Sequence, residues 1–281
     1  MIDPADVEQL EKLLRRHGIT LEHRLGQNFL IDSQTRDVIA AAAGIDPSDE
    51  VLEVGAGAGT LTVALAPACR RLIAVELDLR LIPVLQEVLK GHKNVEVVKS
   101  DILRVDLAAA FPSGGEVVAG NIPYNLTGAL IRKVLDHPPR PRRLSLVVQK
   151  EVAERWTAAT GASLATVAVQ VFAEATMVMT IPAESFLPAP KIDSALVTLE
   201  VRQRPAVEVD DMDRFFRFVE AVFQFRRKQL GGTLVRIAGT PSVDVAARLR
   251  ELGIDAARRP QTVTLAEWEG LYRAFNTRLG R

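Results

Sequence analysis

The sequence predicts an α/β protein with a mostly parallel, doubly wound sheet, followed by a small domain made only of helices. Short apolar runs alternate with helical patterns from about residue 50 to residue 173, which is the order that parallel sheets require. A glycine-rich turn follows the first of these runs. After residue 205 no convincing strand pattern remains. We therefore expect a first domain over residues 1–205 and a helical domain over residues 206–281.

The composition is that of a globular protein with a substantial core. The chain has 281 residues, of which 48% are hydrophobic and 25% charged, and its formal net charge is zero. No apolar run approaches the roughly 20 residues that span a bilayer, and the charged N-terminus is unlike a signal peptide. The single Cys69 and the scattered histidines give no metal-ligand spacing. We expect a cytoplasmic monomer that uses no metal and no membrane.

The first segment is predicted to form an amphipathic helix over residues 3–17. Asp3 suits the cap of this helix, and Pro4 suits its first position. The next run, from His23 to Leu30, is too irregular for a strand. Asn28 and its neighbour Gln27 could satisfy polar groups of a ligand, or the run could simply precede a helix at about 33–43.

The alternating region is divided into strands and helices by its apolar periodicity. The expected parallel strands are Glu50–Val54, Arg71–Val75, Val95–Val98, Val117–Ala119 and Leu144–Val148. The expected helices of this region are Thr60–Ala66, Leu79–Lys90, Leu126–Leu135, 150–158 and 163–173. Two β-rich runs at about 175–181 and 195–201 predict a hairpin that adds antiparallel strands at one edge. The later helices are expected at Asp213–Gln224, Arg226–Ile237, Val243–Leu252 and Leu265–Thr277.

The glycine-rich turn after the first strand contains Gly55, Gly57 and Gly59. A dinucleotide-binding turn has glycines at relative positions one, three and six, but the sixth position here is Thr60. The turn also lacks the Lys-Ser or Lys-Thr pair of a phosphate-binding loop. The spacing therefore favours a turn that passes close to a ligand without holding a pyrophosphate.

Two carboxylates follow the next two strands. Glu76 lies 21 residues after Gly55 and can accept hydrogen bonds from both hydroxyls of a ribose. Asp101 follows the third strand and can accept a hydrogen bond from an adenine amine. Because the turn has no phosphate-binding residues, the adenosyl ligand most consistent with these residues is S-adenosylmethionine. The alternatives are NAD and a turn that binds no ligand.

The fourth strand leads into the tetrapeptide Asn121-Ile122-Pro123-Tyr124. In an open α/β sheet the ligand crevice lies beyond the carboxyl ends of the strands, so we expect the tetrapeptide at its mouth. An amide side chain, the carbonyl of Pro123 and the face of Tyr124 could hold a planar base by its edge and its face. The alternative is a strand followed by a proline turn without a ligand.

Several runs resemble the ribosomal RNA adenine dimethylase family. The runs that carry this resemblance are Leu25–Leu30, Val51–Thr62, Ala74–Asp78, Asn121–Asn125, Val148–Val152, Phe186–Ser194 and Phe225–Lys228, and they span both domains. Leu252–Asp255 and Arg258–Pro260 are similar to the small-subunit branch of this family. The large-subunit branch, which confers macrolide resistance, shares the first domain.

The resemblance implies an enzyme that dimethylates the N6 of adenines in small-subunit ribosomal RNA with S-adenosylmethionine, during assembly of the subunit. It implies that cofactor contacts come from Asn28, Leu30, Gly55, Glu76, Asp101 and Asn121. It implies that the target adenine is held by Asn121, Tyr124 and Phe186, with the Pro123 carbonyl as a second acceptor for the amine. The alternatives are a large-subunit rRNA methyltransferase, a non-catalytic assembly factor of the same fold, and a methyltransferase for a small molecule.

The C-terminal region is basic although the whole chain is neutral. From Arg202 onward there are 15 Lys and Arg against 10 Asp and Glu, a net charge of about +5. Arg226, Arg227 and Lys228 form the sharpest cluster, and we expect them to contact RNA phosphates. A second basic group is Arg140, Arg142, Arg143, Lys150 and Arg155. The chain departs from the family pattern at 22–24, 162–166 and 231–232, all on expected loop or RNA-facing positions.

Overall fold

The computed structural model describes residues 2–20, 28–111, 116–136 and 138–275. The chain divides into two compact units. One comprises Met1–Glu154 with Glu174–Val201, and the other Arg155–Ala173 with Arg202–Arg281. These units differ from the expected domains mainly in residues 155–173, which group with the C-terminal helices. The reason is tertiary, because the Phe172 ring stacks on the Phe216 ring with centroids 5.6 Å apart.

The first unit is built on a seven-stranded sheet in the order β4-β3-β2-β5-β6-β9-β7. Its strands are β2 (Glu50–Val54), β3 (Arg71–Glu76), β4 (Val95–Lys99), β5 (Val117–Asn121), β6 (Arg143–Gln149), β7 (Ala173–Ile181) and β9 (Ser194–Val201). Strands β2 to β6 pair in parallel, and β9 pairs antiparallel with β6. The mostly parallel, doubly wound sheet with an antiparallel edge is therefore confirmed.

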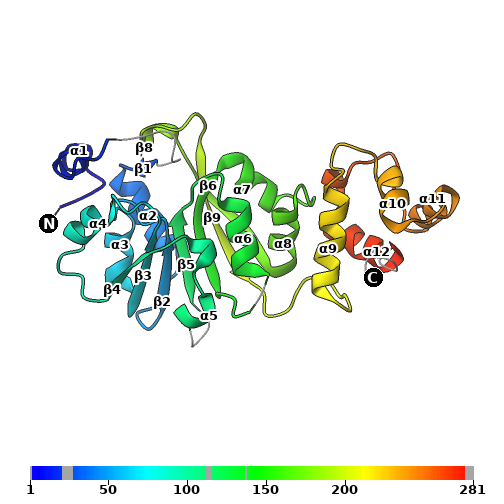
Figure 1. The fold of residues 1–281 in the computed structure, drawn as a ribbon, viewed down its shortest axis with the longest axis horizontal. Helices are drawn as coiled ribbons and strands as arrows, with labels where there is room; N and C mark the ends of the chain where they lie inside the picture. The colour runs from blue at the N-terminus through cyan, green and yellow to red at the C-terminus, as the bar shows by residue number, and fades with distance from the viewer. Residues whose placement is uncertain (1, 21–27, 112–115, 137, 276–281) are drawn as a thin grey trace. The chain divides into compact units, whose positions relative to one another are not determined.

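Helices flank this sheet on both sides, with α2, α3 and α4 on one side and α6 on the other (Figure 1). The helices of the region are α1 (Val7–Arg16), α2 (Ser33–Ala42), α3 (Thr62–Leu65), η2 (Ala66–Ala68), α4 (Ile82–Val88), η3 (Ile102–Arg104), α5 (Leu107–Ala110), α6 (Thr127–Leu135), α7 (Lys150–Thr157) and η4 (Ala183–Ser185). Helix α1 begins later than predicted. Asp6 caps it by accepting from the Gln9 N–H at 3.0 Å, whereas Asp3 accepts from the Ala5 N–H.

A two-stranded sheet corrects one prediction. Phe29–Leu30 belongs to the run His23–Leu30, whose pattern predicts no strand, but these two residues form β1. It pairs antiparallel with β8 (Phe186–Leu187), so that Leu30 lies opposite Phe186. Local pattern could not reveal this pairing, because the partners are far apart in the chain. The rest of the run, including residues 22–24 and Gln27, lies outside the described residues.

The core between the sheet and helices α2 and α3 is apolar and holds the strands in fixed positions. Val51, Leu72 and Val117 from three adjacent strands are fully buried and pack in one cluster with Ile39 of α2 and Leu65 of α3. Burial of such side chains contributes roughly 1.5–3 kcal/mol each. The rigid sheet therefore presents the residues at its carboxyl end at fixed positions.

Gly120 shows how tightly β5 approaches β2. A Cβ on this residue would lie 2.5 Å from the Val54 carbonyl oxygen, closer than van der Waals contact allows. Only glycine therefore fits directly before Asn121. This close approach brings the end of β5 against the turn that follows β2.

The second unit is helical among its described residues, apart from an isolated bridge between Thr160 and Thr264. Its helices are α8 (Leu164–Phe172), α9 (Met212–Phe223), α10 (Leu230–Ala238), α11 (Ser242–Glu251), η5 (Pro260–Thr262) and α12 (Leu265–Phe275). An aromatic cluster of Phe218, Trp268 and Tyr272 holds α9 against α12.

At the departures from the family pattern, Ser163 caps α8 by accepting from the Thr166 N–H. Gly231 lets α10 approach Ala256, whose Cβ would lie 3.0 Å from an added Cβ.

The residues Arg226 to Lys228 correct another prediction. We expected a helix over Arg226–Ile237, but α10 begins only at Leu230. The three basic residues lie in a turn, where the Lys228 N–H donates to the Phe225 carbonyl at 2.8 Å. A turn projects neighbouring side chains in different directions, so the three charges are not confined to one helix face.

Candidate functional site

A cavity of about 800 Å³ lies at the carboxyl ends of β2, β3, β4 and β5. This is where ligands bind in open α/β sheets. Its volume is within the range of cofactor pockets. Every residue that the sequence assigned to the cofactor or to the target base lines this cavity: Asn28, Leu30, Gly55, Glu76, Asp101, Asn121, Pro123, Tyr124 and Phe186.

The glycine-rich turn forms one wall of the cavity. Gly55 and Gly57 have φ values of 73° and 58°, a left-handed conformation that side chains with a Cβ rarely adopt. The Gly55 N–H donates to the Val75 carbonyl at 2.9 Å, which ties the turn to β3. The Phe29 ring covers Gly57, since a Cβ there would lie 3.4 Å from the ring. The backbone of the turn therefore stays close to the cavity.

Glu76 lies at the end of β3 and is almost completely buried. Its Oε2 accepts from the Gly57 N–H at 2.7 Å, and its Oε1 accepts from the Asp78 N–H at 2.8 Å. Burial raises the pKa of this carboxyl, although the backbone donors oppose the shift. Each oxygen keeps a further lone pair, so the fixed carboxylate can still accept from two hydroxyls of a ligand.

Asp101 and Leu30 complete the part of the cavity that could hold an adenosine. Asp101 caps η3, and its Oδ1 accepts from the Leu103 N–H at 3.0 Å. This bond fixes the carboxylate beyond the end of β4. Leu30 is 4% exposed and offers an apolar surface through its place in β1.

The Asn121 side chain has a defined orientation. Its Nδ2 donates to the Asn28 carbonyl at 2.8 Å. A carbonyl can only accept, so the amide nitrogen must face Asn28, and the Asn121 Oδ1 remains as an acceptor for a ligand. Asn28 therefore acts through its backbone, by setting the amide of Asn121.

Pro123 and Tyr124 follow Asn121 in the turn before α6. The Pro123 carbonyl accepts from the Leu126 N–H at 2.8 Å, which uses one of its two lone pairs and leaves one. The Tyr124 hydroxyl lies 2.9 Å from the Ser194 Oγ at the start of β9. This bond ties the tyrosine ring to a strand that follows much later in the chain. Sequence reasoning missed Ser194, since its partner is 70 residues away.

Phe186 lies between the hydrophobic core and the cavity. It is 3% exposed and belongs to the core cluster that contains Ile39 and Leu65. It also lines the cavity, because β8 holds it opposite Leu30. A core side chain of this kind has little freedom to move, so it presents a fixed apolar surface to the cavity.

Glu53 is a further polar residue of the cavity to which we assigned no role from sequence. It lies in β2 and is 1% exposed. Burial, together with the nearby Glu76 carboxylate, raises its pKa to about 8, while the Thr62 hydroxyl partly opposes this. Its signal in the sequence is a charged residue inside the apolar run Val51–Val54. Across the described residues, no group of three or more possible metal ligands occurs.

The basic residues divide into bonded and exposed ones. Arg142 pairs with Asp49, and Arg143 pairs with Glu200, so this second basic group is largely used within the protein. By contrast Arg226, Arg227 and Lys228 in the second unit are exposed. None of these three has an ion-pair partner within the described part of the chain. They are therefore available to an anionic ligand.

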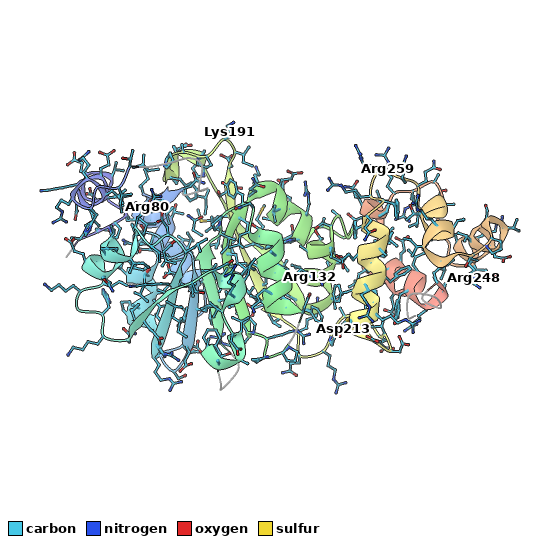
Figure 2. All side chains as sticks on the ribbon, viewed as in Figure 1. Arg80, Arg132, Lys191, Asp213, Arg248 and Arg259 are labelled. Atoms are coloured by element: carbon cyan, nitrogen blue, oxygen red, sulfur yellow. The ribbon has the colours of Figure 1, made fainter. Side chains whose placement is uncertain are left out.

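Arg259 is exposed near the same turn, whereas its neighbour Arg258 is bound to Glu267. The Leu230 N–H donates to the Arg258 carbonyl at 2.8 Å, which fixes this segment beside the start of α10. Figure 2 shows Arg259 and Asp213 at opposite ends of α9. Arg259 was not singled out as an RNA contact from sequence, because its proximity to residues 226–228 depends on the fold.

No helix in the described ranges is long and apolar enough to cross a membrane.

Comparison with known proteins identifies a family whose model matches this chain and several proteins that are similar to it. The family model described as ribosomal RNA adenine dimethylase matches residues 18–272. A protein named ribosomal RNA small subunit methyltransferase A from Pelotomaculum thermopropionicum is 39% identical, over 98% of this chain and 98% of its own length. One of the same name from Shouchella clausii is 37% identical, over 99% and 97%.

Two solved structures have similar folds. The crystal structure of the 23S rRNA methyltransferase ErmE has a TM-score of 0.69 and 32% identity, and covers 89% of this chain and 100% of its own. A dimethyladenosine transferase from Plasmodium falciparum has a TM-score of 0.70 and 28% identity, over 86% and 95%. Both similarities extend well beyond the residues of the cavity.

Proposed function

Because the chain belongs to the ribosomal RNA adenine dimethylase family, we propose that it dimethylates the N6 of adenines in small-subunit ribosomal RNA and uses S-adenosylmethionine as methyl donor. The names of the two relatives support the small subunit as the source of the RNA. The observation that carries the proposal is the joint placement of Glu76, Asp101 and Asn121 on one cavity. This enzyme would act on RNA of a partly assembled subunit in the cytoplasm.

The cavity residues fit an adenosyl cofactor. Glu76 offers a buried carboxylate for ribose hydroxyls, and its backbone partners at Gly57 and Asp78 keep it in place. Asp101 would accept from the adenine amine, while Leu30 would contact its ring. The bound cofactor would supply a methyl group on a positively charged sulfonium.

The acceptor amine needs orientation more than deprotonation. An adenine amine is a weak nucleophile, because its lone pair is delocalised into the ring. We propose that the Asn121 Oδ1 and the Pro123 carbonyl accept its two hydrogens and favour a pyramidal nitrogen. They would also stabilise the positive charge that develops as the N–C bond forms and the S–C bond breaks. The proton then leaves to water.

The adenine would be extruded from its RNA strand and held between aromatic rings. Tyr124 would stack on one face, and Phe186 would bound the other. The hydrogen bond to Ser194 keeps the Tyr124 ring from rotating away. This arrangement suits any adenine, so the choice of nucleotide would come from the basic surface.

We expect Tyr124→Ala to lower kcat/KM for rRNA by about 5- to 150-fold, because base–aromatic stacking is worth about 1–3 kcal/mol. Tyr124→Phe retains the ring and removes only the hydrogen bond with Ser194, so its effect should be much smaller. Steady-state methylation with labelled donor measures both. Equal reductions in the two variants would contradict a stacking role.

We propose that Arg226, Arg227 and Lys228, with Arg259 beside them, contact RNA phosphates. Replacing the first three by Ala should weaken binding of small-subunit rRNA fragments. It should also reduce the slope of log affinity against log salt by about 1 for each phosphate that the variant no longer neutralises. Filter binding or fluorescence anisotropy across a salt series measures both quantities.

The matched control is Arg204→Ala. Arg204 is exposed in the same unit but precedes α9, whose 12 residues span about 18 Å, whereas the cluster follows this helix. This control should leave the salt slope nearly unchanged. A triple variant with the slope of the unmodified protein would rule out the assigned surface.

The activity itself is tested by mass spectrometry of rRNA after incubation with the protein and S-adenosylmethionine. We expect dimethyladenosine in small-subunit RNA, with naked RNA and partly assembled subunits compared as substrates. Dimethyladenosine confined to large-subunit RNA would instead favour the activity of the ErmE-like relatives. Absence from both RNAs would indicate a non-catalytic role in assembly.

A further inference from the structure

Glu53 is a buried carboxyl group on the floor of the cavity. It lies in β2, is 1% exposed and lines the cavity. Its Oε2 has no hydrogen-bond partner among the residues described. A buried polar atom without a partner is costly, and a buried unpaired charge costs far more. Among the described residues, this oxygen therefore has no group that would stabilise a charge on it.

The strand register places Glu53 between the two ends of the proposed ligand site. Glu53 lies opposite Ala74 of β3 and Ala119 of β5 in the parallel sheet. Glu76 and Asn121 lie two residues further along those strands, and alternate residues of a strand face the same side. All three polar side chains therefore share one face of the sheet.

The strand order determines what must pass over Glu53. β2 lies between β3 and β5 in the sheet. A cofactor that reaches from a ribose at Glu76 to a methyl acceptor at Asn121 must cross the end of β2. The part of S-adenosylmethionine between its ribose and the transferred methyl group is the sulfonium.

Of the groups that face Glu53 from its neighbours, the Thr62 hydroxyl stabilises the carboxylate only in part, and none carries a positive charge. β3 contributes the Glu76 carboxylate, which repels it. β5 contributes the neutral Asn121, α2 contributes Ile39, and α3 contributes the neutral hydroxyl of Thr62. The other titratable residues that line the cavity are Asp78, Arg80, Asp101 and Tyr124.

Arg80 is the basic residue of this lining in the described part of the chain, and it pairs with Asp78, which also lines the cavity. Its Nη2 lies 2.9 Å from the Asp78 Oδ2. Among the described residues that line the cavity, the buried carboxyl groups of Glu53 and Glu76 therefore have no ion pair with a basic side chain. A cationic ligand would supply the missing charge.

We propose that Glu53 is the counter-charge for the sulfonium of the methyl donor, and that it makes the pocket prefer S-adenosylmethionine over the neutral thioether product. This inference rests on the proposed cofactor site. Without ligand, burial raises the pKa of this carboxyl to about 8, which favours its protonated form below that pH. Binding of the cation favours the carboxylate, so a proton passes from Glu53 to the solvent. The product carries no sulfonium and gives no such release.

The first test is calorimetry of the unmodified protein with S-adenosylmethionine and with S-adenosylhomocysteine. Both ligands carry the same α-amino and carboxyl groups, so their difference isolates the sulfonium. Between about pH 6 and pH 8 the affinity for the donor should rise relative to that for the product. The ratio of the two affinities should rise by at most about tenfold per pH unit, which corresponds to release of one proton. Buffers of different ionisation enthalpy give the number of protons directly.

The second test compares Glu53→Gln with Glu96→Gln, an exposed carboxylate on β4. Glu53→Gln should remove the extra proton release and weaken binding of S-adenosylmethionine at least about tenfold at pH 8. The affinity for S-adenosylhomocysteine should change by less than about threefold. Glu96→Gln should behave like the unmodified protein.

A third measurement needs no ligand. The raised pKa of Glu53 means that the folded state loses stability relative to the unfolded state as pH rises from about 4.5 to about 8. Glu53→Gln removes this loss. Its Tm advantage over the unmodified protein should therefore be larger at pH 8 than at pH 5.

The outcomes separate the two proposals. Donor and product with the same pH dependence and the same proton count would overturn the role of Glu53, even though both bind. Failure of both ligands to bind would overturn the cofactor site and the role of Glu53 together. The comparison of ligands on the unmodified protein decides the matter even if the variant does not fold.

Discussion

Asn121→Ala is expected to lower the rate of methyl transfer by about 10²–10³-fold, the typical effect of removing one preorganised polar contact to a developing charge. The variant lacks the Oδ1 that would accept from the adenine amine. It also releases the Asn28 carbonyl, to which the Asn121 Nδ2 donates at 2.8 Å. The affinity for S-adenosylmethionine should fall only moderately, because Glu76 and Asp101 remain. Single-turnover methylation and calorimetry measure the two effects separately.

The matched control for this variant is Gln34→Ala, which removes an exposed amide on α2 away from the cavity. Its turnover should equal that of the unmodified protein. Asn121→Asp is informative as well, since a carboxylate cannot donate to the Asn28 carbonyl and should turn away from it. Near-normal turnover of Asn121→Ala would exclude this residue from the chemistry.

Glu76→Ala is expected to weaken binding of S-adenosylmethionine by about 100-fold or more. Hydrogen bonds to a charged group contribute about 1.5–3 kcal/mol each, and the carboxylate would accept from two ribose hydroxyls. The variant also leaves the Gly57 and Asp78 N–H groups without their acceptor, so the glycine-rich turn should loosen. Isothermal calorimetry measures the change in affinity, and thermal unfolding shows whether the fold is retained.

Glu96→Ala is the control for this effect. It removes an exposed carboxylate from the neighbouring strand β4, where it pairs with the partly exposed Arg71. Exposed ion pairs are worth about 0–1 kcal/mol, and this one does not line the cavity. The affinity of this control for the cofactor should remain within about twofold. If Glu76→Ala also binds normally, the cofactor site lies elsewhere.

The agreement between sequence and structure is closest where local rules are strong. The strand Glu50–Val54 has the bounds that its apolar pattern predicts, and Glu76 and Asn121 end β3 and β5. A one-residue shift of a strand moves its side chains to the opposite face, so burial fixes the register. Once these strands lie in one parallel sheet, residues at their carboxyl ends must meet at one edge. This is why Glu76, Asp101 and Asn121 were predictable from the strand pattern, whereas Leu30 and Phe186 were indicated only by the family resemblance.

Predictions failed where a partner distant in the chain decides the local structure. Phe29 and Leu30 form a strand only because Phe186 and Leu187 pair with them. Helix α10 starts at Leu230 instead of Arg226, since its first N–H groups donate to the carbonyls of Arg258 and Ala256. No local pattern contains such partners.

The sequence by itself determined the alternating strands and helices of the parallel sheet, the glycine-rich turn, and the placement of Glu76, Asp101 and Asn121 at strand ends. Periodicity, turn chemistry and the rule for strand ends act over a few residues, so they can be read directly from the chain. Only the tertiary structure showed that Asn28 orients Asn121 and that Ser194 holds Tyr124. It also showed that Glu53 is buried between the strands of Glu76 and Asn121. The physical reason is that hydrogen-bond partners and burial depend on which distant segments the sheet brings together.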